Sequence, residues 1–148
     1  MTVQFRPASR AEVPAVLSLL ADDMLGRNRE GTDIQPYLAA FDAMQAQGGN
    51  LLIVGLLKHR IVACYQLVLI PGLSAAAALR AQIEGVRVAS DLRGQGIGAQ
   101  LIADAEMRAR AAGCRQMQLT TNRARTDAHR FYDRLGFTPS HIGYKKTL

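Results

Sequence analysis

The chain has 148 residues, of which 49% are hydrophobic and 20% are charged, a composition typical of a single globular domain covering residues 1–148. Its formal net charge of +6 suits an anionic partner, either nucleic acid or a phosphate-bearing cofactor, but the arginines are dispersed rather than gathered in a basic tail. No apolar stretch is long enough to span a bilayer, and the first residues lack the pattern of a signal peptide. We therefore expect a cytoplasmic protein with no membrane partner.

The cysteines and histidines do not indicate a metal site. Cys64 and Cys114 lie far apart in the sequence, and the histidines form no close pair. We expect both cysteines to be reduced thiols that pack against their neighbours, and no metal to be bound.

Apolar periodicity and turn residues predict an alternation of strands and helices. Ser9 and Glu12 have the spacing of a helix capping box, and Gly113 follows the clearest helix as a C-cap. In chain order the predicted elements are a strand at residues 3–6, a helix capped by Ser9, a loop at 22–32, a helix at 34–47, a strand pair at 51–57 and 61–69, a loop or helical turn at 74–79, a strand at 81–88, a helix at 97–112, a strand at 116–121, a helix at 128–135, and a final strand from Phe137 onward. This order predicts an α/β fold, a mixed sheet with helices on its faces.

A glycine-rich segment connects the strand at residues 81–88 to the helix that follows. Alternating glycines allow a tight turn, and the first turn of a helix offers unpaired N–H groups and a partial positive charge, which together bind anions. The segment consists of Arg93, Gly94, Gln95, Gly96, Ile97 and Gly98, and Ala99 continues the helix.

Three interpretations of this segment compete. It can be a strand-to-helix connection without a ligand. Gly94, Gly96 and Ala99 also satisfy a loose dinucleotide-binding pattern, but that pattern needs an acidic residue at the end of the next strand, where this chain has Asn122. No Gly-Lys-Ser/Thr follows either, so a Walker phosphate loop does not fit. The third interpretation is a site for acetyl-CoA.

Two motifs, in order, resemble the GCN5-related N-acetyltransferase (GNAT) family. Arg93, Gly96 and Gly98 match the Arg/Gln-x-x-Gly-x-Gly/Ala motif of that family. Residues 128–132, Ala-His-Arg-Phe-Tyr, followed by Leu-Gly-Phe at 135–137, match its second signature. The resemblance implies a twisted mixed sheet of six to seven strands flanked by about four helices. Residues 127–132 and 140–141 also look like a subgroup that includes aminoalkylphosphonate acetyltransferases.

The resemblance further implies roles for particular residues. Backbone groups around Val86, Arg87 and Val88 are expected to bind the pantetheine arm of acetyl-CoA and to polarise its carbonyl, because neighbouring parallel strands splay apart there. Tyr132, beside Phe131, is the expected general acid, since a tyrosine stays protonated at neutral pH and a leaving thiolate accepts its proton.

Glu84 and Asn122 are further candidates. Glu84 is expected on the same strand face as Val86 and Val88, where burial would raise its pKa and suit it to act as general base. The alternative is a strand-edge charge or a structural pair with Arg80. Asn122 is expected to bond the pantetheine arm, although residues 123–127 make an insertion relative to the family.

For the acceptor, the resemblance implies the loops at residues 22–30 and 71–80. Asp22 and Asp23 can hold a cationic amine, and Arg27 and Arg29 a carboxylate or phosphonate. We therefore expect acetyl transfer to a primary amine of a small molecule or a peptide, within a protein that can form a homodimer. A non-catalytic acyl-CoA sensor stays open, and a nucleic-acid-binding module fits less well because the few aromatic residues fall in predicted core elements.

Overall fold

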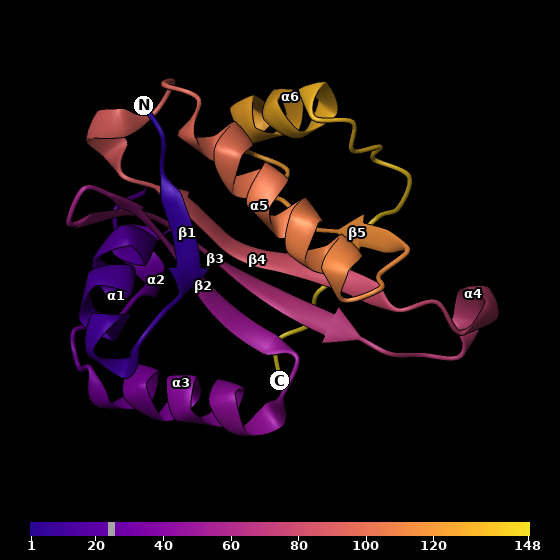
Figure 1. Ribbon diagram of the computed structural model, residues 1–148, viewed down its shortest axis with the longest axis horizontal. Helices are drawn as coiled ribbons and strands as arrows, with labels where there is room; N and C mark the ends of the chain where they lie inside the picture. The colour runs from indigo at the N-terminus through magenta and orange to yellow at the C-terminus, as the bar shows by residue number, and fades with distance from the viewer. Residues whose placement is uncertain (24–25) are drawn as a thin grey trace.

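The computed structural model describes residues 1–23 and 26–148. Its centre is a five-stranded sheet in the order β1-β2-β3-β4-β5, with antiparallel pairing from β1 to β4 and parallel pairing between β4 and β5 (Figure 1). The strands are β1 (Gln4–Pro7), β2 (Asn50–Leu57), β3 (Arg60–Ile70), β4 (Arg80–Val88) and β5 (Gln116–Gln118).

Helices cover the sheet from two sides. Figure 1 shows α1 and α3 on one side and α5, with α6 beside it, on the other. The helices are α1 (Val13–Ala21), α2 (Gly26–Arg29), α3 (Gln35–Gln47), α4 (Ser74–Ala77), α5 (Ile97–Ala111) and α6 (Thr126–Arg134), with 3-10 turns η1 (Arg10–Glu12) and η2 (Ser90–Leu92). The α/β class is thereby confirmed.

The helix starts follow local sequence chemistry. The predicted capping box is present, since the backbone N–H of Ser9 donates to Glu12 Oε2 at 2.8 Å and Arg6 adds an ion pair to Glu12 at 2.6 Å. Together these contacts hold the pKa of Glu12 well below its usual value, at about 2, with the bond from Arg6 as the largest cause.

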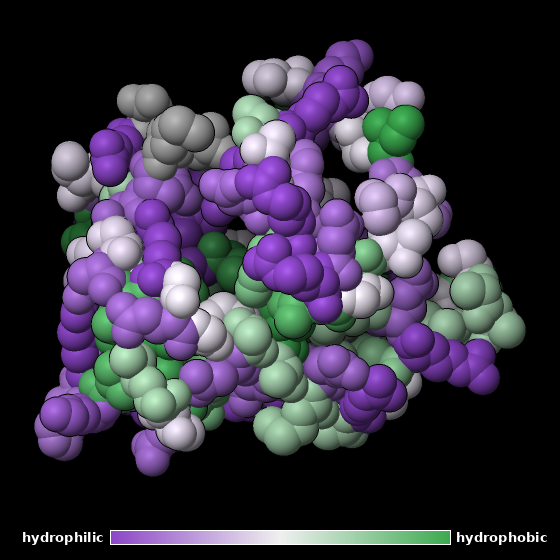
Figure 2. All heavy atoms as spheres, turned by 90° about the horizontal axis from the view of Figure 1, so that it is seen from above, coloured by the Kyte–Doolittle hydropathy of each residue, from purple (hydrophilic) through white to green (hydrophobic). Residues whose placement is uncertain are grey.

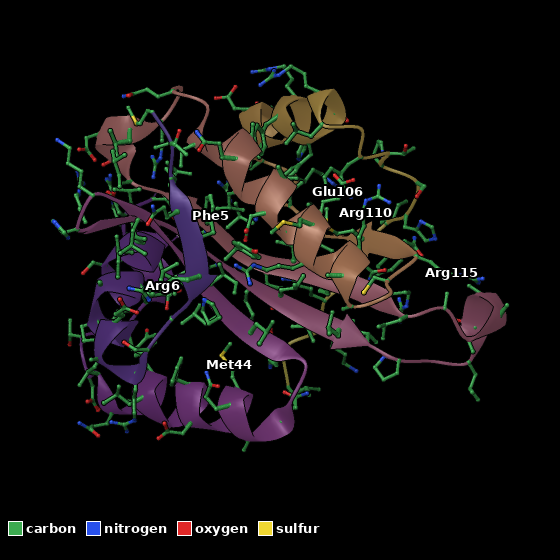
Figure 3. All side chains as sticks on the ribbon, viewed as in Figure 1. Phe5, Arg6, Met44, Glu106, Arg110 and Arg115 are labelled. Carbon is green, nitrogen blue, oxygen red and sulfur yellow. The ribbon has the colours of Figure 1, made fainter. Side chains whose placement is uncertain are left out.

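A polar contact anchors α5 on the sheet. Tyr65 of β3 is fully buried, and its hydroxyl donates to Asp104 of α5 at 2.5 Å. Arg108 donates to the same carboxylate at 2.7 Å, so Asp104 has two partners. On the outer side of α5, Glu106 and Arg110 form an exposed ion pair one turn apart (Figure 3). The inner side, with Ile97 and Leu101, is buried.

The sheet has fewer strands than the resemblance implies. The expectation of six to seven strands is wrong for the described residues, which contain five. The predicted strand at residues 116–121 is reduced to Gln116–Gln118, and no strand forms from Phe137 onward. A strand requires a neighbour for its backbone hydrogen bonds, and Pro139 in this segment has no N–H to donate.

A β-bulge changes the side-chain order of β4. Cys64 pairs with Arg87 and Gln66 pairs with Glu84, so two residues, Gly85 and Val86, lie opposite Tyr65. Gly85 has a φ of 58°, a conformation that glycine adopts without strain. Residues on either side of the bulge therefore do not alternate as the sequence alone suggests.

Two general expectations can be compared with the fold. Cys64 is buried and Cys114 partly buried, and both are free thiols, as expected; burial raises the pKa of Cys64 to about 12. Within residues 1–23 and 26–148, no helix combines the length and the apolar character that crossing a membrane requires.

Candidate functional site

The parallel pairing between β4 and β5 covers only the first part of β4. The ladder joins Arg80 to Gln116, Ala81 to Met117 and Gln82 to Gln118. From Ile83 to Val88, β4 has no partner strand on this side within the described chain. Its backbone groups here are available to a ligand lying along the strand.

The glycine turn, residues 93–98, follows this open part of β4. Gly94 and Gly96 have φ values of 75° and 82°, so the turn depends on glycine, and Gly96 is the N-cap of α5. A Cβ at either position would meet nothing within 4 Å, so the turn borders open space. The fifteen-residue helix α5 directs its free N–H groups toward that space, an arrangement that binds anions.

A cavity of about 380 Å³ lies beside the turn and the open part of β4. Opposite β4, its wall is formed by the start of α6. Figure 2 shows polar side chains gathered over the face seen from above, with a hollow that opens onto apolar atoms. The lining residues are Asp23, Val86, Arg87, Val88, Arg93, Ala124, Arg125, Thr126, Asp127 and Ala128.

A second, smaller cavity of about 70 Å³ adjoins the first and contains the predicted catalytic residues. Tyr132, Glu84 and Thr121 line it, and Arg125 and Val86 line both cavities. Burial raises the pKa of Tyr132, while the positive charges of Arg125 and Arg87 oppose the shift. Tyr132 thus keeps its proton at neutral pH.

Comparison with known proteins gives this arrangement a family. The model of the Acetyltransferase (GNAT) family matches residues 14–137. The chain belongs to the GNAT acetyltransferase family.

Relatives and solved structures agree with this assignment. The chain is 48% identical over 67 residues to the aminoalkylphosphonate N-acetyltransferase of Salmonella typhimurium, a match that covers 45% of this chain and 44% of that protein's length. It is 41% identical to a crystal structure described as a transcriptional regulator from Bacillus halodurans C-125, with a TM-score of 0.94 and coverage of 99% and 100%. A candidate acetyltransferase from Agrobacterium tumefaciens str. C58 is 30% identical, with a TM-score of 0.88 and coverage of 98% and 99%.

Membership of the GNAT family makes this protein an acyltransferase, and the family uses acetyl-CoA. Two observations fit that cofactor. The turn at Gly94 and Gly96 leaves space for phosphates, and the buried hydroxyl of Thr121 has no hydrogen-bond partner among the described residues. Sequence reasoning missed Thr121, and its only signal was its place directly before Asn122. The described residues contain no cluster of His, Cys, Asp and Glu suited to a metal.

Most of the predicted cofactor-binding residues come together around the larger cavity and the turn. Ile97 is buried beneath the turn, and Gln95 donates to the carbonyl of Asp91 at 3.3 Å. Gly98 packs against Phe131, because a Cβ there would lie 3.0 Å from that ring. Phe131 therefore packs α6 against α5 at the end of the glycine turn. Ala99, which is also on α5, is exposed.

Asn122 closes a turn at the start of the predicted insertion. Its Oδ1 accepts from the N–H of Ala124 at 2.9 Å, and its backbone carbonyl accepts from Arg125 at 3.0 Å. The side-chain oxygen thus has a local partner, while the two donors of the amide group have none among the described residues.

The structure corrects the expected orientation of Glu84. Glu84 pairs with Gln66 of β3, and Val88 pairs with Ala63. Because these two partners are three residues apart on β3, Glu84 and Val88 lie on opposite faces of β4. The bulge at Gly85 causes this change. Glu84 is also exposed, so the expected burial is absent. The alternative pair with Arg80 is not formed, since Arg80 donates to Gln118 at 3.2 Å.

The acidic pair after α1 already has partners within the protein. Asp23 forms an ion pair with Arg87 at 2.8 Å, and Asp22 accepts from the N–H of Ser90 at 3.2 Å, so both carboxylates have partners inside the protein. Desolvation lowers the pKa of Arg87, and the charge of Asp23 opposes that shift. Met24 and Leu25 lie outside the described residues.

The other expected acceptor loop, residues 71–80, lies far from the cavities. It joins β3 to the first residue of β4, whereas the glycine turn follows the last residue (Figure 1). None of the residues 71–80 lines either cavity.

Proposed function

We propose that this protein transfers the acetyl group of acetyl-CoA to the primary amine of a small molecule, by direct attack of the amine within a ternary complex. The observation that carries this proposal is the open part of β4, which leads into the glycine turn and faces Tyr132. One continuous site then holds the phosphates at residues 93–98 and the thioester beside Val86 and Val88.

Tyr132 acts as the general acid in this proposal. Tyr132 lines the smaller cavity, and its hydroxyl keeps its proton at neutral pH because burial raises its pKa. Proton donation to the leaving sulfur as the thioester breaks yields free coenzyme A. Backbone N–H groups of β4 stabilise the negative charge that develops on the carbonyl oxygen.

Glu84 is the proposed general base. It lines the same cavity as Tyr132, and because it is exposed it removes the amine proton through water rather than from a dry pocket. Glu84 pairs with Gln66, on the face of the sheet opposite the one on which Tyr65 meets α5. We expect the amine to approach from this side.

The acceptor is proposed to carry an anionic group as well as the amine. The Salmonella relative is named for aminoalkylphosphonates, which have both groups. Arg125 supports this proposal because it lines both cavities and forms no ion pair among the described residues. By contrast, Arg130, within the helix α6 that Arg125 precedes, pairs with Asp127.

The test is a panel of amines with acetyl-CoA and a readout of released thiol. The panel pairs 2-aminoethylphosphonate and β-alanine with neutral ethanolamine and a short peptide. We expect turnover of the first two and weak turnover of the others. Equal turnover of neutral amines would contradict the acceptor proposal and leave acetyl transfer intact.

Absence of turnover with every amine, together with tight binding of acetyl-CoA, would favour the sensor. Calorimetric titration with acetyl-CoA measures that binding directly. Together with the panel, the titration distinguishes a protein that binds acetyl-CoA without transferring the acetyl group from one that does not bind acetyl-CoA.

We also propose a homodimer that involves the C-terminal segment. Ile142 and Tyr144 are 70% and 91% exposed there, although apolar side chains normally gain by burial. Light scattering on the full chain and on a chain ending at Phe137 tests this: a monomeric full chain contradicts the proposal. A cytoplasmic location likewise stays a prediction.

A further inference from the structure

The smaller cavity lies where the pairing between β4 and β5 stops. The last pair of the ladder joins Gln82 to Gln118, and the residues that follow each of them line the cavity. One wall is β4 from Ile83 to Arg87, the other is the segment 119–121, and Tyr132 of α6 lines the same space. A ligand in this gap can therefore be contacted from both walls and from α6.

The side chain of Thr121 is an unexplained feature of this cavity. Thr121 lines the space, yet its hydroxyl oxygen Oγ1 is buried and has no hydrogen-bond partner within residues 1–23 and 26–148. A buried hydroxyl without a partner is unfavourable, so it calls for a catalytic or ligand-binding explanation. The staggered rotamers of threonine exchange its hydroxyl and methyl positions, so a ligand in the cavity can draw the hydroxyl toward itself.

The backbone that follows Thr121 is fixed to the start of α6. The carbonyl of Asn122 accepts from the N–H of Arg125 at 3.0 Å and lies 3.0 Å from His129 Nε2. Since Tyr132 belongs to the same helix, these contacts connect the two residues through a short stretch of well-bonded chain. Thr121 and Tyr132 are therefore held at one cavity as a pair.

The proposed reaction brings an atom that needs hydrogen-bond donors to this pair. When the C–S bond of the thioester breaks, its electron pair moves to the sulfur, which then takes the proton of Tyr132. A second donor stabilises the sulfur while it carries negative charge, because hydrogen bonds to ionised acceptors are the stronger ones. The positive charges of Arg125 and Arg87, which oppose the rise in the pKa of Tyr132, also favour an anion here.

We propose that Thr121 is a second hydroxyl donor to the leaving sulfur of the cofactor, together with Tyr132. Tyr132 transfers its proton and yields the free thiol, and the proton that the amine releases restores Tyr132 through water. Thr121 keeps its own proton and donates a hydrogen bond, because an aliphatic alcohol is a far weaker acid than a phenol. This inference rests on the proposed function, which brings the thioester to Tyr132.

Binding of coenzyme A and of desulfo-coenzyme A, compared by calorimetric titration, tests this contact without an acceptor. Desulfo-coenzyme A keeps the phosphates and the pantetheine arm but has hydrogen in place of the thiol. Thr121→Val keeps the shape of the side chain and removes its hydroxyl. At alkaline pH, where the bound thiol ionises, we expect the Kd of coenzyme A to rise about tenfold in this variant and that of desulfo-coenzyme A to change by about twofold or less.

Equal changes for the two ligands would overturn the inference, because Thr121 would then contact the arm rather than the sulfur. Unchanged binding of both ligands would overturn it as well. If the unmodified chain binds neither ligand, the proposed function fails instead, so the two failures are distinguishable.

Two further variants control for the size and the place of the change. Thr121→Ser keeps the hydroxyl, so we expect it to retain the preference for coenzyme A over desulfo-coenzyme A. Thr138→Val makes the same chemical change at an exposed residue that lines neither cavity, and we expect no effect on either Kd.

Thermal unfolding separates a ligand contact from a structural one. Because the hydroxyl of Thr121 has no partner among the described residues, Thr121→Val should keep or raise the Tm. If that variant does not fold, Thr121→Ala, which removes the hydroxyl without adding bulk, decides the outcome in the same titration. A preference for coenzyme A that survives in the folded variant without the hydroxyl overturns the inference.

Discussion

The two ends of β4 differ in how their backbones are used. At Arg80–Gln82 the strand pairs with β3 on one side and β5 on the other, and Ala81 is fully buried. From Ile83 to Val88 it pairs with β3 alone, and two cavities border the free side. One strand is thus paired on both sides at its start and has a free edge at its end, where we propose that the cofactor binds.

The largest expected effect lies at the open end. Tyr132→Phe removes the proposed proton donor, so kcat should fall about 100-fold or more. Its hydroxyl has no hydrogen-bond partner among the described residues, so the free energy of unfolding should change little. An assay of released thiol measures kcat. Thermal unfolding serves as the control that the variant is folded. An unchanged kcat would remove Tyr132 from the mechanism.

The next effect belongs to the closed end. Ala81→Leu adds methyl groups where the side chain is 0% exposed, so overpacking should lower the free energy of unfolding by about 1–3 kcal/mol. The folded fraction should keep its kcat, because Ala81 borders neither cavity. Denaturant unfolding and kinetics on the same sample measure both. A selective loss of kcat would mean that the two ends are not separable.

A smaller effect is expected from the glycine turn. Gly96→Ala places a Cβ in open space but forces a φ of 82°, at a cost of about 1 kcal/mol. The KM for acetyl-CoA should rise several-fold. Gly72→Ala is the matched control, since its Cβ is equally unobstructed and its φ is not positive. Equal KM values for the two variants would argue against a ligand at the turn.

The smallest effect concerns the contacts that close the start of β4. Gln118 donates to Gln82 at 2.8 Å and accepts from Arg80 at 3.2 Å. Gln118→Ala should lower the free energy of unfolding by about 1 kcal/mol, the usual net worth of such bonds. Denaturant unfolding measures this change. A fall in kcat larger than twofold would show that the anchor controls the binding edge directly.

Local sequence patterns predicted those parts of the fold that local chemistry determines. The capping box at Ser9, the helix α5 and the tight turn at Gly94 and Gly96 follow from residues a few positions apart. The glycine turn could therefore be predicted from local sequence, whereas the role of Tyr132 was an expectation from family resemblance. Their common location around two adjoining cavities was an expectation from family resemblance, not from spacing.

The features that sequence could not give depend on distant residues. The bulge that reverses Glu84 is defined by pairing with β3, and alternation along β4 alone does not reveal it. The partner of Asp23 is Arg87, which is remote in the sequence, so a surface-exposed acidic pair was the simpler interpretation. The last predicted strand failed because its formation requires a neighbouring strand that the described chain does not supply.

The bulge at Gly85 also determines how variation should be distributed along β4. Before it, the odd-numbered Ala81 and Ile83 point toward α5; after it, that side belongs to the even-numbered Val88, while Arg87 pairs with Cys64 on the other face. On the α5 side of β4, a systematic substitution scan should therefore favour apolar side chains at the odd-numbered Ala81 and Ile83 and at the even-numbered Val88. Deleting this single glycine would leave Val86 alone opposite Tyr65, so regular alternation would return while Arg87 and Val88 keep their partners on β3.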